Sequence, residues 1–340
     1  MRAKRIVRGI VTTLVGAGLL LGGQALAQEK LRIPVAQTNS TTSLVEQVAI
    51  HKGFFKDIGY DARVYSVSGG ENAAVLALER GQLPFFGSDD NIALAIRPGS
   101  NIRIVGTELN TLPYWLVGGK HVKSYKDLPR PVKVGISSPT SGNVYVSLKL
   151  LQTAGIPEKD VRLIKVGGSS ARLAGVKAGK IDVGSLTFGK MLAARDAGLT
   201  VLGAAEQFVK EYAFLQLAMN KNFIKDNPDK AVALMGTLIR GCAFVNDPKN
   251  GEEVLNVYQN VMRNKPHIAK KMYEIEILEA KSIPNRCQAT AAGIEAYIES
   301  AFWTKSIAKD TKIPPMEQIM FQEFYDKALA WYNNKGWMKK

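Results

Sequence analysis

Two loops rich in hydroxyl side chains have the composition of an anion-binding site. One precedes an apolar segment with helical spacing and contains Ser137, Ser138, Thr140 and Ser141. The other precedes a similar segment and runs from Gln37 to Thr42, with Gln37, Thr38, Asn39 and Ser40 as its candidate binding residues. Free N–H groups and the positive dipole end at a helix N-terminus favour a negative group, so these loops suit a small anion or a carboxylate. Ordinary N-capping is the alternative, but it needs one hydroxyl per helix and each loop carries several.

Two adjacent carboxylates point to a different ligand chemistry. Asp89 and Asp90 would repel an anion, but they could accept hydrogen bonds from an amine or an amidine. Ser88 and Asp89 could instead cap a helix that starts near Asn91. Four aromatic residues could give such a ligand a wall for a ring or an alkyl chain, with core packing as the equal alternative: Tyr114, Trp115, Phe188 and Tyr212.

Motifs of catalysis and metal binding are missing from the sequence. His51, His121 and His267 lie far apart, and none has Cys or carboxylate neighbours at ligand spacing. The chain contains no Gly-x-Ser-x-Gly pentapeptide and no Walker loop, so we expect neither a hydrolase nor an ATPase. A non-enzymatic protein without metal or cofactor is therefore predicted.

An internal repeat organises these residues. A Gly-rich loop, a helix pattern, a closing Gly and an apolar strand occur twice, with Gly70 and Gly81 in one copy and Gly168 and Gly179 in the other. Both intervals are 11 residues and the copies are offset by 98 residues. Each copy, extended in both directions, predicts strand, polar loop, helix, strand, Gly loop, helix, strand and polar loop.

Alternating strands and helices predict an α/β fold in two lobes, each a mostly parallel sheet flanked by helices. Ligands of such sheets bind beyond the carboxyl ends of the strands, so the two sets of loops should face each other across a cleft. The predicted division is 28–118 plus 215–340 for the first lobe and 119–214 for the second, with crossings near Ile102–Val117 and Tyr212–Leu217. The loops at this edge add further candidates for ligand binding: Gly70, Ser88, Gly168, Ser169 and Thr187.

The segment from Asn227 onward predicts helices. Asn227 and Pro228 are an N-cap and a first-turn residue, and apolar residues then recur at helical spacing. We expect these helices to cover the first lobe.

The first 27 residues have the pattern of a secretory signal peptide. Four basic residues precede an apolar run from Ile10 to Leu21, and Ala25 to Ala27 form a small-residue cleavage site. An uncleaved membrane anchor is the alternative. Removal of this segment leaves 41 basic and 30 acidic residues, a net charge of +11, and the scattered Lys residues argue against a nucleic-acid partner.

Cys242 and Cys287 are the two cysteines of the chain, and neither follows the cleavage point as a lipoprotein would require. An exported protein free in the periplasm is therefore expected. In that oxidising compartment the two cysteines could form a disulfide, with two buried free thiols as the alternative.

Nearly all of residues 30–340 resembles the periplasmic substrate-binding proteins of ABC importers in the nitrate, sulfonate, taurine and thiamine-precursor group. The matching motifs are Lys52 to Phe55 with Gly59, Leu78 to Gly81, Lys123 to Leu128, Lys133 to Gly135 and Ala178 to Asp182. Pro129, Arg130 and Pro131 depart from the family pattern in a connecting turn.

The resemblance implies a type II periplasmic-binding fold and a protein that captures a small organic or inorganic anion and delivers it to an ABC permease. A separate subunit would hydrolyse ATP, and we expect a monomer. A pyrimidine or thiamine precursor or another amine-bearing ring is the alternative ligand, and a periplasmic enzyme on the same fold is the alternative class.

Overall fold

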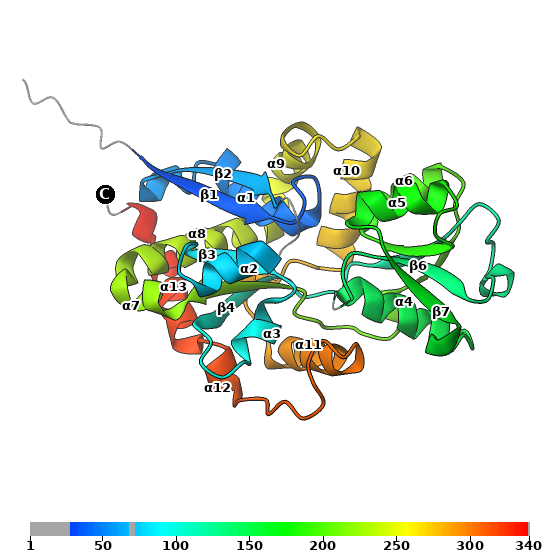
Figure 1. Ribbon diagram of the computed structural model, residues 1–340. Helices are drawn as coiled ribbons and strands as arrows, with labels where there is room; N and C mark the ends of the chain where they lie inside the picture. The colour runs from blue at the N-terminus through cyan, green and yellow to red at the C-terminus, as the bar shows by residue number, and fades with distance from the viewer. Residues whose placement is uncertain (1–27, 68–71, 140, 339–340) are drawn as a thin grey trace, which may run out of the picture.

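The computed structural model describes residues 28–67, 72–139 and 141–338 (Figure 1). The predicted signal peptide and two candidate site residues, Gly70 and Thr140, lie outside these ranges.

The first third of the chain, together with one later strand, forms two small sheets. The first pairs β1 (Glu29–Val35) with β2 (Tyr60–Ser66) in parallel, and the second has the order β3 (Phe85–Ser88), β10 (Leu215–Asn220), β4 (Ile102–Leu109). The intervening helices are α1 (Leu44–His51), α2 (Asn72–Glu79) and α3 (Asn91–Ala95). We call these elements, with the C-terminal helices, lobe I.

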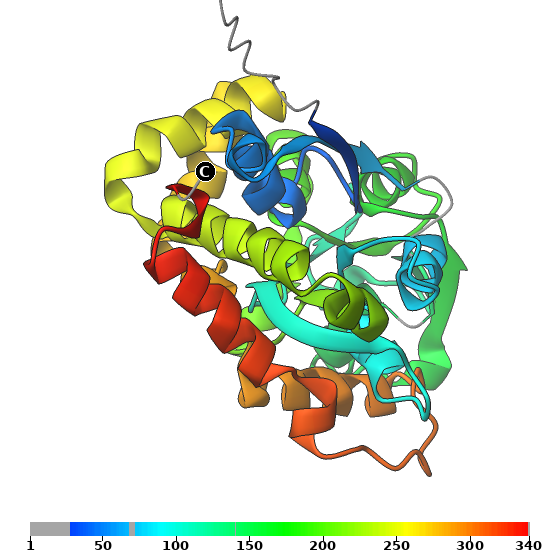
Figure 2. The same cartoon turned by 90° about the vertical axis from the view of Figure 1, so that its left-hand side faces the viewer.

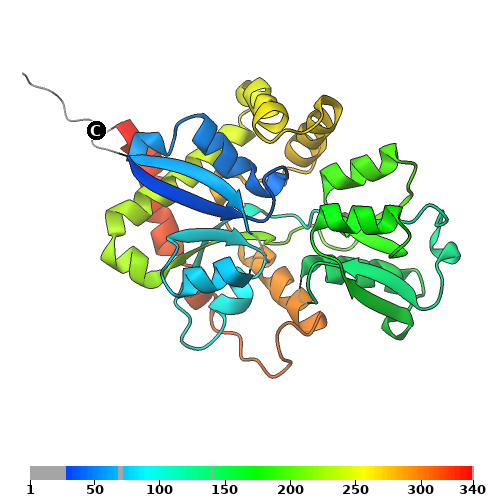
Figure 3. The ribbon, with the colours of Figure 1, turned by 45° about the horizontal axis from the view of Figure 1, so that its top comes forward.

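The middle of the chain forms one five-stranded sheet with the order β7-β6-β8-β5-β9. Its strands are β5 (Trp115–Gly118), β6 (Val132–Ile136), β7 (Val161–Lys165), β8 (Val183–Leu186) and β9 (Val201–Ala204). Its helices are α4 (Gly142–Thr153), α5 (Ser169–Lys177) and α6 (Phe188–Asp196). We call these elements lobe II; they lie beside lobe I in Figure 3.

The internal repeat corresponds to two copies of one structural unit. β1, α1, β2, α2, β3 and α3 form the first copy, and β6, α4, β7, α5, β8 and α6 form the second. The repeated glycines Gly81 and Gly179 have φ angles of +73° and +68° just after α2 and α5. Glycine ends a helix readily in this left-handed conformation, which explains why both copies keep it at the same spacing.

Strand pairing across the three sheets is partly parallel and partly antiparallel, whereas the sequence pattern predicted mostly parallel pairing. β6 pairs in parallel with β7 and β8, but β5 pairs antiparallel with β8 and β9, and β10 pairs antiparallel with β3 and β4. β4, β5, β9 and β10 flank the two points where the chain passes between the lobes. Because these strands lie outside the repeated units, the β-α-β alternation did not determine their direction.

The two crossing segments are hydrogen-bonded to each other. The Tyr212 N–H donates to the carbonyl of Asn110 at 2.8 Å, and the Phe214 N–H donates to that of Leu109 at 2.9 Å. The Ala205 N–H donates to the carbonyl of Tyr114 at 3.0 Å. A paired connection of this kind is suited to act as a hinge.

The C-terminal helices cover lobe I, as predicted. They are α7 (Lys221–Asp226), α8 (Pro228–Asn246), α9 (Gly251–Asn256), α10 (Pro266–Met272), α11 (Ala291–Trp303), α12 (Met316–Ile319) and α13 (Gln322–Asn333). α8 packs on α1, and α13 lies along α8 (Figure 2). A Cβ atom at Gly236 of α8 would lie 2.2 Å from the Trp331 ring of α13, so this close approach requires glycine.

Two of these helices also reach lobe II, which the sequence did not predict. His267 on α10 contacts Asp196 on α6, with 3.0 Å between Nε2 and Oδ2. The rings of Trp303 on α11 and Tyr145 on α4 meet at a centroid distance of 5.5 Å. The C-terminal region therefore contacts both lobes.

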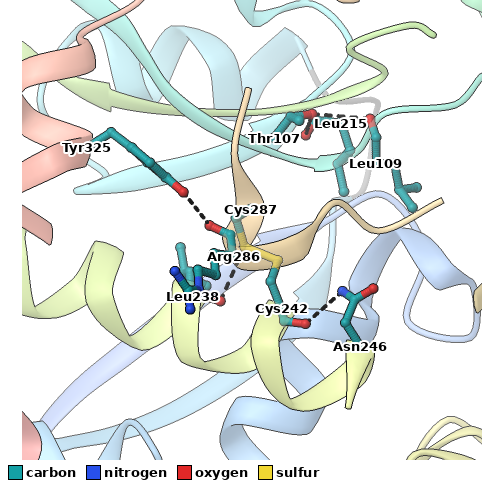
Figure 4. The surroundings of a disulfide bond; sticks show 9 residues. All are labelled: Thr107, Leu109, Leu215, Leu238, Cys242, Asn246, Arg286, Cys287 and Tyr325. Atoms are coloured by element: carbon teal, nitrogen blue, oxygen red, sulfur yellow. Dashed lines mark hydrogen bonds between the residues drawn. A yellow bond between two sulfur atoms is a disulfide. The ribbon is translucent and has the colours of Figure 1, made fainter. Parts of the chain in front are cut away.

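Cys242 and Cys287 form a disulfide between α8 and the segment that precedes α11 (Figure 4). Both residues are fully buried. In the part of the chain that the structure describes, no helix combines the length and the apolar character needed to cross a membrane.

Candidate functional site

A cavity of about 460 Å³ lies between the two lobes, and we call it the interlobe cleft. Lobe I contributes Gln37, Thr42, Asp89 and Asp90 to its wall, and lobe II contributes residues of the β6, β7 and β8 loops. Tyr114, in the crossing segment, lines it as well. Both sets of repeated polar loops therefore meet in one cavity.

The β6–α4 loop presents a linked group of hydroxyls to the cleft. Ser137, Ser138 and Ser141 all line the cavity. The Ser137 and Ser141 hydroxyls are 2.8 Å apart, and the Asn143 side-chain amide donates to both. Ser141 occupies the N-cap of α4 without a side-chain capping bond. Asn143 thus fixes two hydroxyls of the loop, and it was not recognised in the sequence.

The N-terminus of α5 forms a second donor-rich part of the wall. Gly168 is its N-cap, and Ser169 is its first residue. The Ser169 hydroxyl accepts from the Thr187 N–H at 2.9 Å and lies 3.2 Å from the Thr187 hydroxyl. These three residues line the cleft, which places backbone N–H groups and hydroxyls where the helix dipole favours negative charge.

Two basic residues of lobe II that the sequence analysis did not identify line the cleft, Lys165 and Arg172. The Arg172 side chain is 2% exposed, and it donates from Nε to the Ser185 carbonyl at 2.7 Å and from Nη1 to the Gly167 carbonyl at 2.8 Å. Burial lowers the pKa of Arg172, and Tyr114 and Asp89 oppose that shift. A signal was present in the sequence, because a cation in the first turn of a helix is unfavourable with respect to the dipole.

The lobe I wall is acidic. Asp90 is the N-cap of α3 but makes no side-chain capping bond, and its N–H donates to the Ser88 hydroxyl at 3.2 Å. Burial, followed by repulsion from Asp89, raises the pKa of Asp90 to about 7, while Arg97 acts in the opposite direction. Carboxyl groups with a raised pKa in a cleft are typical of functional sites.

Several predicted site residues lie outside this cavity. Asn39, Ser40 and Phe188 line a separate cavity of about 190 Å³, together with Thr187 and residues of α10. Ser88 is fully buried behind the cleft wall, and the Thr38 carbonyl accepts from Gln47 Nε2 at 3.4 Å.

Of the four candidate aromatic residues, Tyr114 alone lines the cleft. The Tyr212 hydroxyl lies 2.7 Å from that of Ser300, and the Tyr212 side chain is buried in the core. Phe188 is also buried, with its ring centroid 5.1 Å from that of Trp115. Phe214, which the sequence analysis missed, is the second aromatic residue of the cleft.

Within residues 28–67, 72–139 and 141–338, no group of three or more His, Cys, Asp or Glu side chains is arranged to hold a metal ion.

Comparison with known proteins assigns the family. The model of the "NMT1/THI5 like" family matches residues 40–250, more than half of the chain, so the chain belongs to this family. No curated protein sequence matches it.

Solved structures support the periplasmic-binding-protein fold. A putative periplasmic sulfonate-binding protein SsuA from Methylobacillus flagellatus KT is 17% identical, with a TM-score of 0.65 and coverage of 91% of this chain and 96% of that chain. The periplasmic nitrate-binding protein NrtA from Synechocystis PCC 6803 is 14% identical, with a TM-score of 0.57 and coverage of 91% and 98%. The desulfurization enzyme DSZB is 12% identical, with a TM-score of 0.63 and coverage of 89% and 99%. At these identities the likeness concerns the fold alone.

Proposed function

We propose that this protein is a solute-binding protein that captures a small anion in the interlobe cleft and delivers it to an ABC permease. The observation that carries the proposal is the lobe II wall, where Arg172 stands beside the N-termini of α4 and α5 and their hydroxyl groups. A buried guanidinium and helix N-termini together favour a negatively charged group. ATP hydrolysis would belong to a separate subunit.

The proposal includes export. We propose that residues 1–27 are removed after Ala27 and that the mature chain, starting at Gln28, works in the periplasm as a monomer. The lobe boundaries at residues 118 and 214 belong to the same proposal. Four strands of the five-stranded sheet lie between them, and the fifth, β5 (Trp115–Gly118), precedes the first boundary.

Two alternatives keep specific support. Asp89 and Asp90 on the lobe I wall favour an amine-bearing ligand, such as a pyrimidine or a thiamine precursor. The structural likeness to the desulfurization enzyme DSZB favours an enzyme on the same fold.

Native mass spectrometry of the protein purified from its source tests the proposed function. A copurified small anion is the expected result, and small-angle scattering should then show compaction when that anion is added back to ligand-free protein. Compaction is expected because the opposed loops of the two lobes can both contact a ligand only when the lobes come together. Chemical conversion of the bound molecule, or an unchanged radius of gyration at saturation, would contradict a binding protein of this type.

The hydroxyl loop gives a second prediction. Ser138→Ala should weaken anion binding by about 1–3 kcal/mol, because one charge-assisted hydrogen bond is lost, and should change the stability of the protein little. Ser124→Ala is a suitable control, because the Ser124 hydroxyl accepts from the Lys126 N–H at 3.3 Å and caps an exposed turn of lobe II. That variant should lose about 1 kcal/mol of stability and keep its affinity. Calorimetric titration and melting curves measure both quantities; intact affinity in Ser138→Ala would exclude a ligand contact there.

A further inference from the structure

The charges that line the interlobe cleft are divided between its two walls. Arg172 and Lys165 belong to lobe II, whereas Asp89 and Asp90 belong to lobe I. A simple anion bound against lobe II would face two carboxyl groups across the cavity. Asp89 favours the charged form of Arg172, and Arg97 acts in the same way on the Asp90 carboxylate, but a simple anion would make no contact with either carboxyl group.

The lobe I wall also contains polar atoms that lack hydrogen-bond partners among the described residues. The Thr42 side chain is 7% exposed and lines the cleft, and its hydroxyl has no partner there. The Gln37 amide oxygen, on the same wall, is buried without a partner as well. Buried polar atoms in native proteins are almost always paired, and an amide oxygen can pair only with a donor. These atoms point to a ligand that brings hydrogen-bond donors to lobe I.

The Asp90 carboxyl group does not cap the helix at which it lies. It stands at the N-cap of α3, where a carboxylate usually accepts from the helix N–H groups, but it makes no such bond. Asp89 precedes it in the chain, and the negative charges of the two carboxylates repel each other. A positively charged group between the lobes would relieve this repulsion.

We infer that the ligand is amphoteric: its anionic group binds near Arg172 and the α4 and α5 N-termini, and an amine or amidine on the same molecule binds Asp89 and Asp90. This inference rests on the proposed binding function and narrows it, because it disfavours inorganic anions and plain alkyl anions as the preferred ligand. Thr42 and Gln37 supply the remaining acceptors for the nitrogen group. When the lobes close, the anionic group of the ligand would contact the lobe II wall and its nitrogen group would contact the lobe I wall.

Two matched pairs of probes test the inference on the full mature chain. The probes are 3-aminopropane-1-sulfonate with propane-1-sulfonate, and 4-aminobutanoate with butanoate; in each pair the members differ by the amino group. In at least one pair the amino compound should bind at least tenfold more tightly by isothermal titration calorimetry. Asp90→Asn and Asp89→Asn should each remove most of that preference, and the affinity for the plain anion should stay equal or rise, because each substitution removes a carboxyl group that repels an anion. Asp61→Asn, which changes a carboxylate on β2 that lines no part of the cleft, is the matched control and should leave both affinities unchanged.

The test distinguishes failure of the amphoteric-ligand inference from failure of the proposed anion-binding function. Equal or tighter binding of the plain anions in both pairs, or a preference that survives both Asn variants, overturns the amphoteric ligand and leaves the proposed anion-binding function standing. Absence of binding by all four probes and by inorganic sulfate and nitrate overturns both. A melting curve for each variant confirms that a lost preference does not come from unfolding; the Asp90→Asn protein should melt at the same or a higher temperature at pH 8, because a buried carboxylate has been removed.

Discussion

Replacement of Arg172 by Met is expected to lower the affinity of the cleft for anionic ligands by about 1.5 to 3.5 decades. Truncation of one member of a buried, hydrogen-bonded charge pair costs about 2–5 kcal/mol, and each decade of affinity corresponds to about 1.4 kcal/mol. Met keeps an unbranched apolar side chain at this position, while the guanidinium, whose carbon lies 5.7 Å from the Tyr114 ring centroid, is lost. The charge and the planar donors are the groups removed.

Arg172→Lys separates charge from geometry. Lys keeps the positive charge, but it cannot donate to the Ser185 and Gly167 carbonyls at the same time as it faces the cleft. We expect an intermediate loss of affinity. Arg195→Gln, at an exposed position at the end of α6, is the control for a change of net charge and should leave the affinity unchanged.

Stability measurements show whether a loss of affinity in Arg172→Met comes from unfolding of the protein. Loss of Arg172 leaves two carbonyl groups without their donor, which costs about 1 kcal/mol each, but it also removes a buried cation. The net change in the free energy of unfolding should therefore be smaller than the change in binding. Full anion affinity in a folded Arg172→Met protein would rule out the proposed role of this residue.

The repeated units of the fold were predictable from the sequence because their signals are local. A glycine that follows a helix at the same position in both copies, Gly81 and Gly179, adopts the left-handed conformation that other residues disfavour. The apolar runs next to these helices form β3 and β8. Strand direction at the crossings was not predictable in this way, since β5 and β10 obtain their antiparallel partners from distant parts of the chain.

The candidate site was predictable at the level of loops and much less at the level of side chains. Ser137, Ser138 and Ser141 were identified from their composition, and they do line the cleft. Arg172 was missed because its signal, a cation near the start of a helix, is weak, and a single Arg in a helix pattern resembles a solvated residue until the fold buries it. Tyr212 was proposed for the cleft from its residue type alone, but its hydroxyl is paired with that of Ser300 within the core.

The disulfide gives the second prediction with a large expected effect. Replacement of both Cys242 and Cys287 by Ala should lower the free energy of unfolding by about 4 kcal/mol, because the bond closes a loop with a sequence separation of 45 residues and so restricts the unfolded chain. Ala avoids placing a new polar group in this fully buried position. The cleft should keep its affinity, since neither cysteine lines it.

The backbone conformation around Cys287 explains why we attribute the expected loss of stability to the loss of the disulfide. Arg286 and Cys287 both have positive φ angles, 60° and 56°, which residues other than glycine adopt at a cost. The segment also lies so close to β4 that a Cβ atom at Gly106 would be 2.6 Å from the Cys287 carbonyl oxygen. Without the disulfide, the hydrogen bond from the Tyr325 hydroxyl to the Arg286 carbonyl, at 3.1 Å, remains to hold this conformation.

Chemical denaturation with and without reductant measures the effect of the disulfide on stability. The wild-type protein should lose stability on reduction, and the stability of the double Ala variant should not depend on the reductant. Equal stability of oxidised and reduced wild-type protein would contradict the prediction.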